Sequence, residues 1–332
     1  MSLFLNPRVI TLAALTSVAP FAIDTYLPAF HMLSEDLLAS PEAIQQTLTF
    51  YLLPYTLMLL FHGPISDGIG RIKTMQWGLL LFFFASIGCA LSTTIESLWF
   101  FRALQGIGGG AGSVVARAMV RDLYEGAEAQ RVMATVQILF GIAPAIAPMI
   151  GGLLLGFHWQ GIFIFLALYA AVSIYMGSKI LPETMTKNML VPITFTGIIE
   201  RYKSLLINKE FILLILSVSA NFSAFFIYVL ASPVFLIDHL GFTAQQFGYL
   251  FIPTVSGMLI GSFISKKTAG VIKPSSVLKF GYYFMFCIAL SNLLFCSFMP
   301  DNAFFNIGFI ALYNIGMASV MPIISLAGLD CF

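Results

Sequence analysis

The sequence has few charged residues and few cysteines. Charged side chains make up 9% of its 332 residues, whereas soluble domains carry about 25%. The four cysteines have neither metal-ligand nor disulfide spacing, so we interpret them as packing residues. A formal net charge of +1 gives no indication of a nucleic-acid partner. No paired His/Glu metal motif, nucleophile motif or phosphate-binding glycine loop is found, so we expect no enzyme activity, metal or cofactor.

Apolar residues dominate instead, at 59% of the chain. They form runs of about 20 residues, the length that crosses a bilayer as a helix. We therefore predict an all-α polytopic membrane protein of about ten helices. Residues 1–180 are expected to form a six-helix bundle, 181–210 a cytoplasmic connection rich in Lys, Arg, Glu and Pro, and 211–332 a second bundle with helices 7 to 10.

The apolar runs give approximate helix positions. The first four helices are expected at about 9–28, 43–63, 74–91 and 98–115, and the others to begin near 132, 161, 211, 247, 276 and 303. Residues 63–73 are then a loop between the second and third helices, and an acidic loop precedes the second.

The charges predict an orientation. If the N-terminus is cytoplasmic, every Lys and Arg except Arg102 lies at or near the cytoplasmic side. The opposite loops contain acidic side chains and no basic one: Glu35, Asp36, Glu42, Glu96, Asp238 and Asp301. Because cytoplasmic loops retain positive charge, we expect a multi-pass protein whose N-terminus is cytoplasmic.

Asp24 and Arg102 are the acid and base expected deep in the first bundle. A carboxylate near mid-bilayer costs at least about 2.5–3.5 kcal/mol, so it is paired, protonated or faces a wet cavity. A neighbouring arginine lowers a carboxylate's pKa and burial raises it, so small movements can change its protonation. The pair is therefore a candidate for proton coupling, the alternative being an ion pair that only fixes helix packing.

Three segments carry motifs. Residues 63–73 read GPISDGIGRIK; Arg102 is followed by Gln105 and Gly106; residues 141–152 read GIAPAIAPMIGG. The two halves also repeat weakly: Pro28-Ala29-Phe30 resembles Pro233-Val234-Phe235, and Pro54 with Gly63 resembles Pro253 with Gly261. Parallel repeats of this kind are typical of transporters.

Together these segments resemble the major facilitator superfamily, specifically its drug:proton antiporters. Residues 22–28 (AIDTYLP) and 115–123 (VARAMVRDL) resemble the bicyclomycin-resistance (Bcr/CflA) branch. The resemblance implies two parallel-repeat bundles and export of small amphipathic drugs in exchange for protons, by alternating access, across a bacterial cytoplasmic (inner) membrane. We expect a monomer whose partners are the lipid bilayer, the substrate and protons.

The resemblance also assigns residues. Asp24 and Arg102 match proton-coupling positions. Further assignments are a cytoplasmic gate at Gly63, Asp67, Gly70 and Arg71, an antiporter motif at Pro144, Pro148, Gly151 and Gly152, and substrate contacts at Tyr26, Tyr51, Gln105, Asn221 and Tyr228. Gly68, Ile72 and Ala147 depart from the family pattern. His62 is either a proton relay or, as we favour, a helix-end histidine wetted by lipid headgroups.

The family has twelve spans, so we expect this second bundle to be incomplete and transport by these residues alone to be weak or absent. Two other interpretations stay open. One is a carrier for a single metabolite or siderophore, and the other is a non-transporting membrane remnant.

Overall fold

The computed structural model describes residues 5–186, 188, 190, 194–239, 241–243, 246, 249, 252–268, 271–298 and 302–330. Within these ranges the chain is helical and forms two compact units, Met1–Thr194 and Phe195–Phe332. The division falls inside the connection expected at 181–210. The expected helix start at Phe247, and Cys331, lie outside the described residues.

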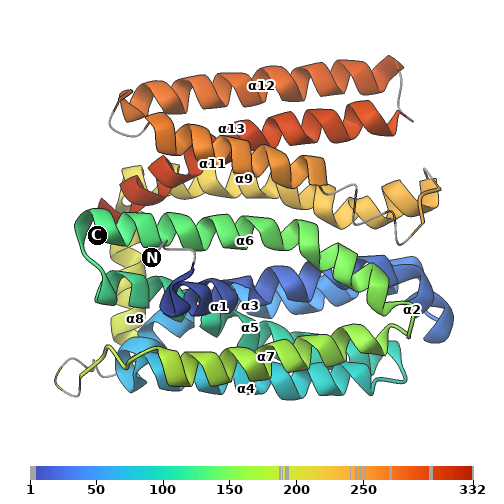
Figure 1. The fold of residues 1–332 in the computed structure, drawn as a ribbon, viewed down its shortest axis with the longest axis horizontal. Coiled ribbons are helices and arrows are strands. Elements are labelled where there is room, and N and C mark those ends of the chain that lie inside the picture. The colour runs from blue at the N-terminus through green and yellow to red at the C-terminus, as the bar shows by residue number, and fades with distance from the viewer. Residues whose placement is uncertain are drawn as a thin grey trace. The chain divides into compact units, whose positions relative to one another are not determined.

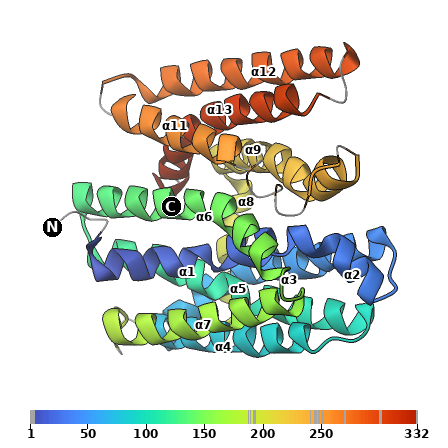
Figure 2. The ribbon, with the colours of Figure 1, turned by 45° about the vertical axis from the view of Figure 1, so that its right-hand side comes forward.

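The first unit contains α1 (Pro7–Asp24), the 3₁₀ helix η2 (Leu27–Ala29), α2 (Phe30–Asp36), α3 (Pro41–Ile69), α4 (Arg71–Ala90), α5 (Ile95–Leu123), α6 (Gly126–Leu154) and α7 (Gln160–Ile180). Its long helices run side by side (Figures 1 and 2). The second unit contains α8 (Phe195–Ile207), α9 (Lys209–Pro233), the π-helix η3 (Val234–His239), α11 (Ile252–Thr268), α12 (Pro274–Phe298) and α13 (Ala303–Asp330).

Local sequence explains where helices of the first unit begin. The Asn6 side chain accepts a hydrogen bond from the Arg8 amide ahead of α1, and Pro7 occupies its first turn. In α3 the Ser40 side chain likewise accepts a hydrogen bond from a backbone amide of the first turn, and Pro41 occupies that turn. These caps satisfy amide groups that a helix leaves unpaired at its start.

Two expected helix ends are wrong. The first helix was expected to reach Pro28, but α1 ends at Asp24, and the chain continues as η2 and α2, with Glu35 and Asp36 inside α2 rather than in a loop. The second helix was expected to end at Gly63, but α3 runs on to Ile69. A helix this long is compatible with Pro54 and Pro64, because neighbouring helices can satisfy the backbone groups that proline frees.

The two units share a packing scheme. In the first, α5 packs against α3, α4 and α1; in the second, α13 packs against α11, α12 and α9. Where α4 meets α5, a Cβ on Gly78 would lie 3.1 Å from the carbonyl oxygen of Gly108. Where α12 meets α13, a Cβ on Gly281 would lie 3.7 Å from the carbonyl oxygen of Gly316. Small residues let the backbones approach closely at the same crossing in both units.

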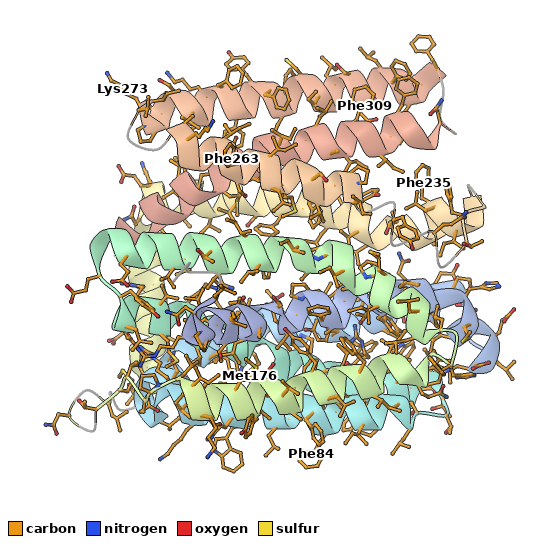
Figure 3. The ribbon with its side chains drawn as sticks, viewed as in Figure 1. Phe84, Met176, Phe235, Phe263, Lys273 and Phe309 are labelled. Carbon is orange, nitrogen blue, oxygen red and sulfur yellow. The ribbon has the colours of Figure 1, made fainter. Side chains whose placement is uncertain are left out.

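Six helices of the described residues are long and apolar enough to cross a membrane: Pro7–Asp36, Pro41–Ile69, Arg71–Ala90, Gln160–Ile180, Lys209–Ser232 and Pro274–Phe298. Three further apolar helices are shorter: Ile138–Leu154, Ile252–Ser265 and Phe305–Met321. The expected ten spans therefore also require α5, which carries Arg102 and glycines and is largely buried. Large apolar side chains such as Phe84 of α4 project outward from the unit (Figure 3), as lipid-facing side chains do.

Candidate functional site

Arg102 lies at the centre of a buried polar cluster in the first unit. Its side chain is fully buried, and one terminal nitrogen donates to the Ala22 carbonyl (3.1 Å) and to the Gln105 side chain (2.9 Å). The guanidinium lies over the rings of Tyr26 and Tyr51, 4.8 and 4.5 Å from their centroids. Such cation–π contacts are strongest when desolvated. Its Nε and second terminal nitrogen have no hydrogen-bond partner among the described residues.

Hydroxyl groups complete this cluster. Gln105 donates to the Ser86 hydroxyl of α4 (2.8 Å), and the Tyr26 hydroxyl lies 2.9 Å from that of Thr47 in α3. Sequence reasoning missed Ser86 and Thr47. Their signal is a hydroxyl residue inside an apolar run, which is too common to be specific.

Asp24 is the last residue of α1 and is 5% exposed. Within the described part of the chain its carboxylate forms no hydrogen bond and no ion pair within 4.0 Å. The direct pairing with Arg102 considered from the sequence is therefore not present. Instead Arg102 lies over the Tyr51 ring and bonds the carbonyl of Ala22, two residues before Asp24. The cluster thus contains a buried acid and a buried base that do not neutralise each other by contact.

The segment with Pro144, Pro148, Gly151 and Gly152 packs against the residue that follows this acid. A Cβ on Gly151 would lie 2.1 Å from the carbonyl oxygen of Thr25, the residue after Asp24. Both prolines lie inside α6, which is bent along its length (Figures 1 and 2). Internal proline is a common cause of helix bending. The glycine therefore brings α6 onto the backbone that positions the Asp24 carboxylate.

The expected loop at 63–73 is instead a single-residue turn. Gly70, with φ of 101° and ψ of 154°, separates α3 from α4. This backbone region is essentially restricted to glycine. Gly63 lies inside α3 with no atom within 4 Å of a Cβ placed on it. The motif thus requires glycine for conformation at 70 and not at 63.

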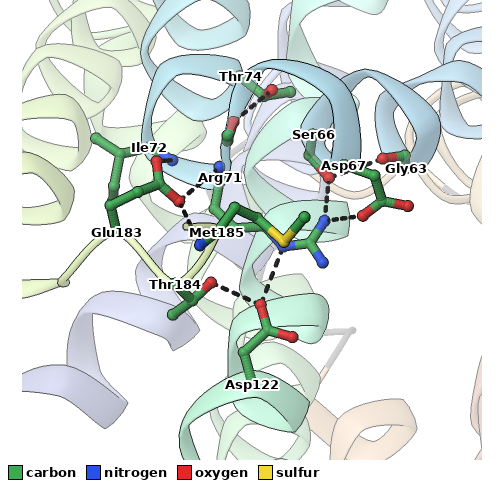
Figure 4. A network of polar contacts seen from close by, with 11 residues as sticks. Gly63, Ser66, Asp67, Arg71, Ile72, Thr74, Asp122, Glu183, Thr184 and Met185 are labelled. Atoms are coloured by element: carbon green, nitrogen blue, oxygen red, sulfur yellow. Dashed lines mark hydrogen bonds and ion pairs between the residues drawn. The ribbon is translucent and has the colours of Figure 1, made fainter. Parts of the chain in front are cut away.

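Arg71 joins three helices beside this turn (Figure 4). Its Nε donates to Asp122 of α5 (3.0 Å), and a terminal nitrogen donates to the Ser66 hydroxyl (2.6 Å) and to Asp67 of α3. Thr184 also donates to Asp122 (2.6 Å). The Arg71 side chain is 9% exposed, less than either carboxylate. Two of the four predicted gate residues, Asp67 and Arg71, are therefore in direct contact.

Glu183 caps the N-terminus of α4. Its two carboxylate oxygens accept from the amides of Arg71 (2.9 Å) and Ile72 (3.0 Å) (Figure 4). A carboxylate is favourable there because the helix start has unpaired amides and a positive dipole end. Sequence reasoning missed Asp122 and Glu183, which lie 51 and 112 residues from Arg71.

The remaining substrate candidates lie in the second unit. Asn221 is 3% exposed and donates to the Tyr282 hydroxyl (3.1 Å). Tyr228 is half-buried and interacts with Thr254 of α11. Throughout the described ranges no group of His, Cys, Asp and Glu side chains is arranged to hold a metal ion.

The Major Facilitator Superfamily profile matches residues 12–332. The chain is 30% identical over 300 residues to the bicyclomycin resistance protein homolog of Haemophilus influenzae, covering 88% of this chain and 75% of that protein. It is 34% identical over 271 residues to the uncharacterised MFS-type transporter YdgK of Bacillus subtilis, covering 81% and 67%. Its identity to multidrug resistance protein D of Escherichia coli is 28% over 257 residues, covering 77% and 64%.

Solved structures agree on the fold. The E. coli xylose transporter in a partially occluded, inward-open conformation matches with a TM-score of 0.71 at 14% identity, over 98% of this chain and 85% of that one. At such low identity the match concerns the fold alone. The chain belongs to the Major Facilitator Superfamily, a family of membrane transporters rather than enzymes, and its bicyclomycin- and multidrug-resistance relatives agree with the Bcr/CflA branch indicated by the sequence.

Proposed function

We propose that this protein exports small amphipathic drugs across a bacterial cytoplasmic membrane in exchange for protons, by alternating access. The relatives named for bicyclomycin and multidrug resistance support the substrate class. The distribution of Lys and Arg supports a cytoplasmic N-terminus. In this arrangement the Arg71 network lies at the cytoplasmic end of the first bundle.

The observation that carries the proposal is the buried, unpaired carboxylate of Asp24, at the end of the helix whose Ala22 carbonyl accepts a hydrogen bond from the buried Arg102. An ionised carboxylate without a partner is costly in a membrane, so a bound proton stabilises the site. A cationic or polarised substrate stabilises the ionised form instead. Proton and substrate therefore compete for Asp24, which is the requirement for exchange.

Arg102 keeps this competition balanced. Tyr26, Tyr51 and Gln105 hold its guanidinium in place, so its charge stays near the acid without forming an ion pair. We propose that substrate contacts these three side chains and thereby shifts Arg102. Asn221 and Tyr228 are the proposed contacts from the second bundle.

The Arg71 network acts in this proposal as the cytoplasmic gate, with Gly63, Asp67 and Gly70. The hydrogen bonds of Arg71 to Asp122 and Glu183 connect α4 with α5 and with the segment after α7. Together with α3, these elements form one rigid end of the first bundle. We propose that residues 1–180 and 211–332 move as two bodies joined by 181–210. Gly151, in the same motif as Pro144, Pro148 and Gly152, brings α6 against the end of α1.

Ethidium efflux tests the proposal. A transporter-deficient bacterium expressing the chain is loaded with ethidium and energised, and its fluorescence is followed with and without a pH gradient. We expect the gradient-dependent efflux of this chain to be weak, to be lost in Asp24→Asn and to be unchanged in Glu35→Gln, at an exposed carboxylate. Gradient-dependent efflux that survives Asp24→Asn contradicts the proposal.

A further inference from the structure

Two hydroxyl groups beside the Arg102 cluster donate their single proton to the main chain of their own helices. Ser86 of α4 donates to the Phe82 carbonyl (2.7 Å), and Thr47 of α3 donates to the Ile44 carbonyl (2.5 Å). Both side chains are fully buried. A hydroxyl group has one proton to donate, but its oxygen can also accept. Each of these hydroxyls therefore meets a further polar neighbour as an acceptor.

Ser86 is the acceptor that Gln105 needs. The side-chain oxygen of Gln105 accepts from Arg102 (2.9 Å), and its amide nitrogen donates to the Ser86 hydroxyl (2.8 Å). A guanidinium group only donates, so the oxygen of the Gln105 amide has to face it and the nitrogen has to face away. The donors thus run in one direction, from Arg102 through Gln105 and Ser86 to the main chain of α4.

Thr47 has the same relationship to Tyr26. The two hydroxyl oxygens lie 2.9 Å apart. Because the proton of Thr47 goes to the Ile44 carbonyl, Tyr26 is the donor of this bond. The guanidinium of Arg102 lies over the Tyr26 ring, 4.8 Å from its centroid. Thr47 therefore holds the far end of the ring on which Arg102 lies.

These two acceptors come from helices that carry neither charged group of the cluster. Arg102 and Gln105 belong to α5, whereas Ser86 belongs to α4 and Thr47 to α3. The packing of α5 against both helices brings these residues together. The position of the guanidinium is thus set by three helices. Without either acceptor, a buried N–H or O–H group would lose its hydrogen bond, which is costly in the absence of water.

We propose that Ser86 and Thr47 are positioning residues that keep Arg102 from pairing with the buried acid. The inference rests on the proposed function. Arg102 bonds the carbonyl of Ala22, two residues before Asp24. A guanidinium released from its two held neighbours can approach that carboxylate, and an opposite charge favours the ionised form. The acid would then be ionised before substrate arrives and would have no proton to exchange.

The number of protons released per ethidium bound tests this role. Each purified variant is mixed with ethidium in weakly buffered detergent with a pH indicator, and bound ethidium is measured by its fluorescence. We expect Ser86→Ala and Thr47→Val to release at most half as many protons per bound ethidium as the unaltered chain. This ratio is independent of the amount of folded protein, which a merely structural role would change. An unchanged ratio in both variants overturns the proposal.

Two other buried hydroxyls provide matched controls. Ser92 donates to the Gly88 carbonyl (2.9 Å) and Thr11 to the Pro7 carbonyl (2.8 Å), so both make the same kind of main-chain bond. Within the described ranges neither accepts a hydrogen bond from another side chain. We expect Ser92→Ala and Thr11→Val to keep the ratio of protons to ethidium. An equal loss in these controls would contradict a specific role for the pair beside Arg102.

Removing the intermediate side chain tests whether Ser86 acts through Gln105. In Gln105→Leu the Ser86 hydroxyl has no amide to hold, so adding Ser86→Ala should lower the melting temperature no further. Independent residues would give additive shifts instead. Ser86→Thr should retain proton release, because a threonine hydroxyl in a helix can still bond the carbonyl one turn back. Additive shifts, or equal losses in Ser86→Thr and Ser86→Ala, overturn the proposal.

The two readouts separate this inference from the proposed function. If the unaltered chain releases protons and Ser86→Ala releases as many per ethidium, the inference fails and the function stands. If ethidium releases no protons from the unaltered chain, the function fails. The positioning of Arg102 then stands if Ser86→Ala lowers the melting temperature and this effect disappears in Gln105→Leu, and it fails if the effect persists there.

Discussion

Gly151 of α6 lies against the main-chain carbonyl of Thr25, so closely that a Cβ at position 151 would sit 2.1 Å from the oxygen. Since Thr25 follows Asp24, this contact fixes the backbone that carries the buried acid. The antiporter motif therefore has a direct structural connection to the proposed proton site.

We predict that Gly151→Val separates α6 from the end of α1 and abolishes ethidium-dependent proton release. Overpacking of this kind costs about 1–3 kcal/mol, which thermal unfolding in detergent will measure. Gly141→Val in the same helix is the control, because no atom lies within 4 Å of a Cβ there. Equal effects of the two substitutions would contradict the role given to the contact.

Gly70→Ala should destabilise the protein where Gly63→Ala does not. Position 70 has a φ of 101°, and its Cβ would lie 2.7 Å from a Glu183 carboxylate oxygen. Holding a non-glycine residue in this region costs about 1–3 kcal/mol. Melting temperatures of the two variants provide the comparison, and equal values would mean that the turn at Gly70 is not what the motif requires.

Glu183→Ala removes the cap from α4. The amides of Arg71 and Ile72 lose their acceptor, so we expect a loss of about 1 kcal/mol in stability. The effect should be accompanied by faster hydrogen exchange at those two amides. Glu96→Ala, in the first turn of α5, is the matched control. Unchanged exchange at Arg71 and Ile72 would exclude the capping role.

Arg102→Lys should not preserve the cluster. Lysine has no planar fork to bond Ala22 and Gln105 while stacking between Tyr26 and Tyr51. The loss of desolvated cation–π contacts alone is worth about 2 kcal/mol. We expect lower thermal stability and loss of ethidium-dependent proton release, whereas Arg117→Lys on the exposed side of α5 should retain both. Normal proton release from Arg102→Lys would show that a positive charge is sufficient.

The sequence was informative about features that depend on position along a helix. Apolar runs located the long helices, and the connection expected at 63–73 contains the turn at Gly70 between α3 and α4. Matched depth in the bilayer brought Asp24 and Arg102 together as candidates. These inferences use only the rise per residue and the cost of charge in lipid.

It was less informative about direction around a helix and about distant partners. Depth does not decide whether Arg102 faces Asp24 or the two tyrosine rings, and the structure has it between the rings. Glu183 reaches Arg71 from 112 residues away, a pairing that depends on how α4 and α7 pack. His62 was judged from its place near a helix end, whereas its burial depends on the neighbouring glycines of α5.

Proton release on substrate binding tests the central claim most directly. Purified protein in weakly buffered detergent, with a pH indicator, is mixed with ethidium, and the Asp24→Asn and Glu35→Gln variants are treated identically. If proton and substrate compete for Asp24, the unaltered chain and Glu35→Gln release protons, ethidium affinity rises with pH, and Asp24→Asn loses both effects. Proton release that persists in Asp24→Asn would contradict the claim that Asp24 carries the exchanged proton.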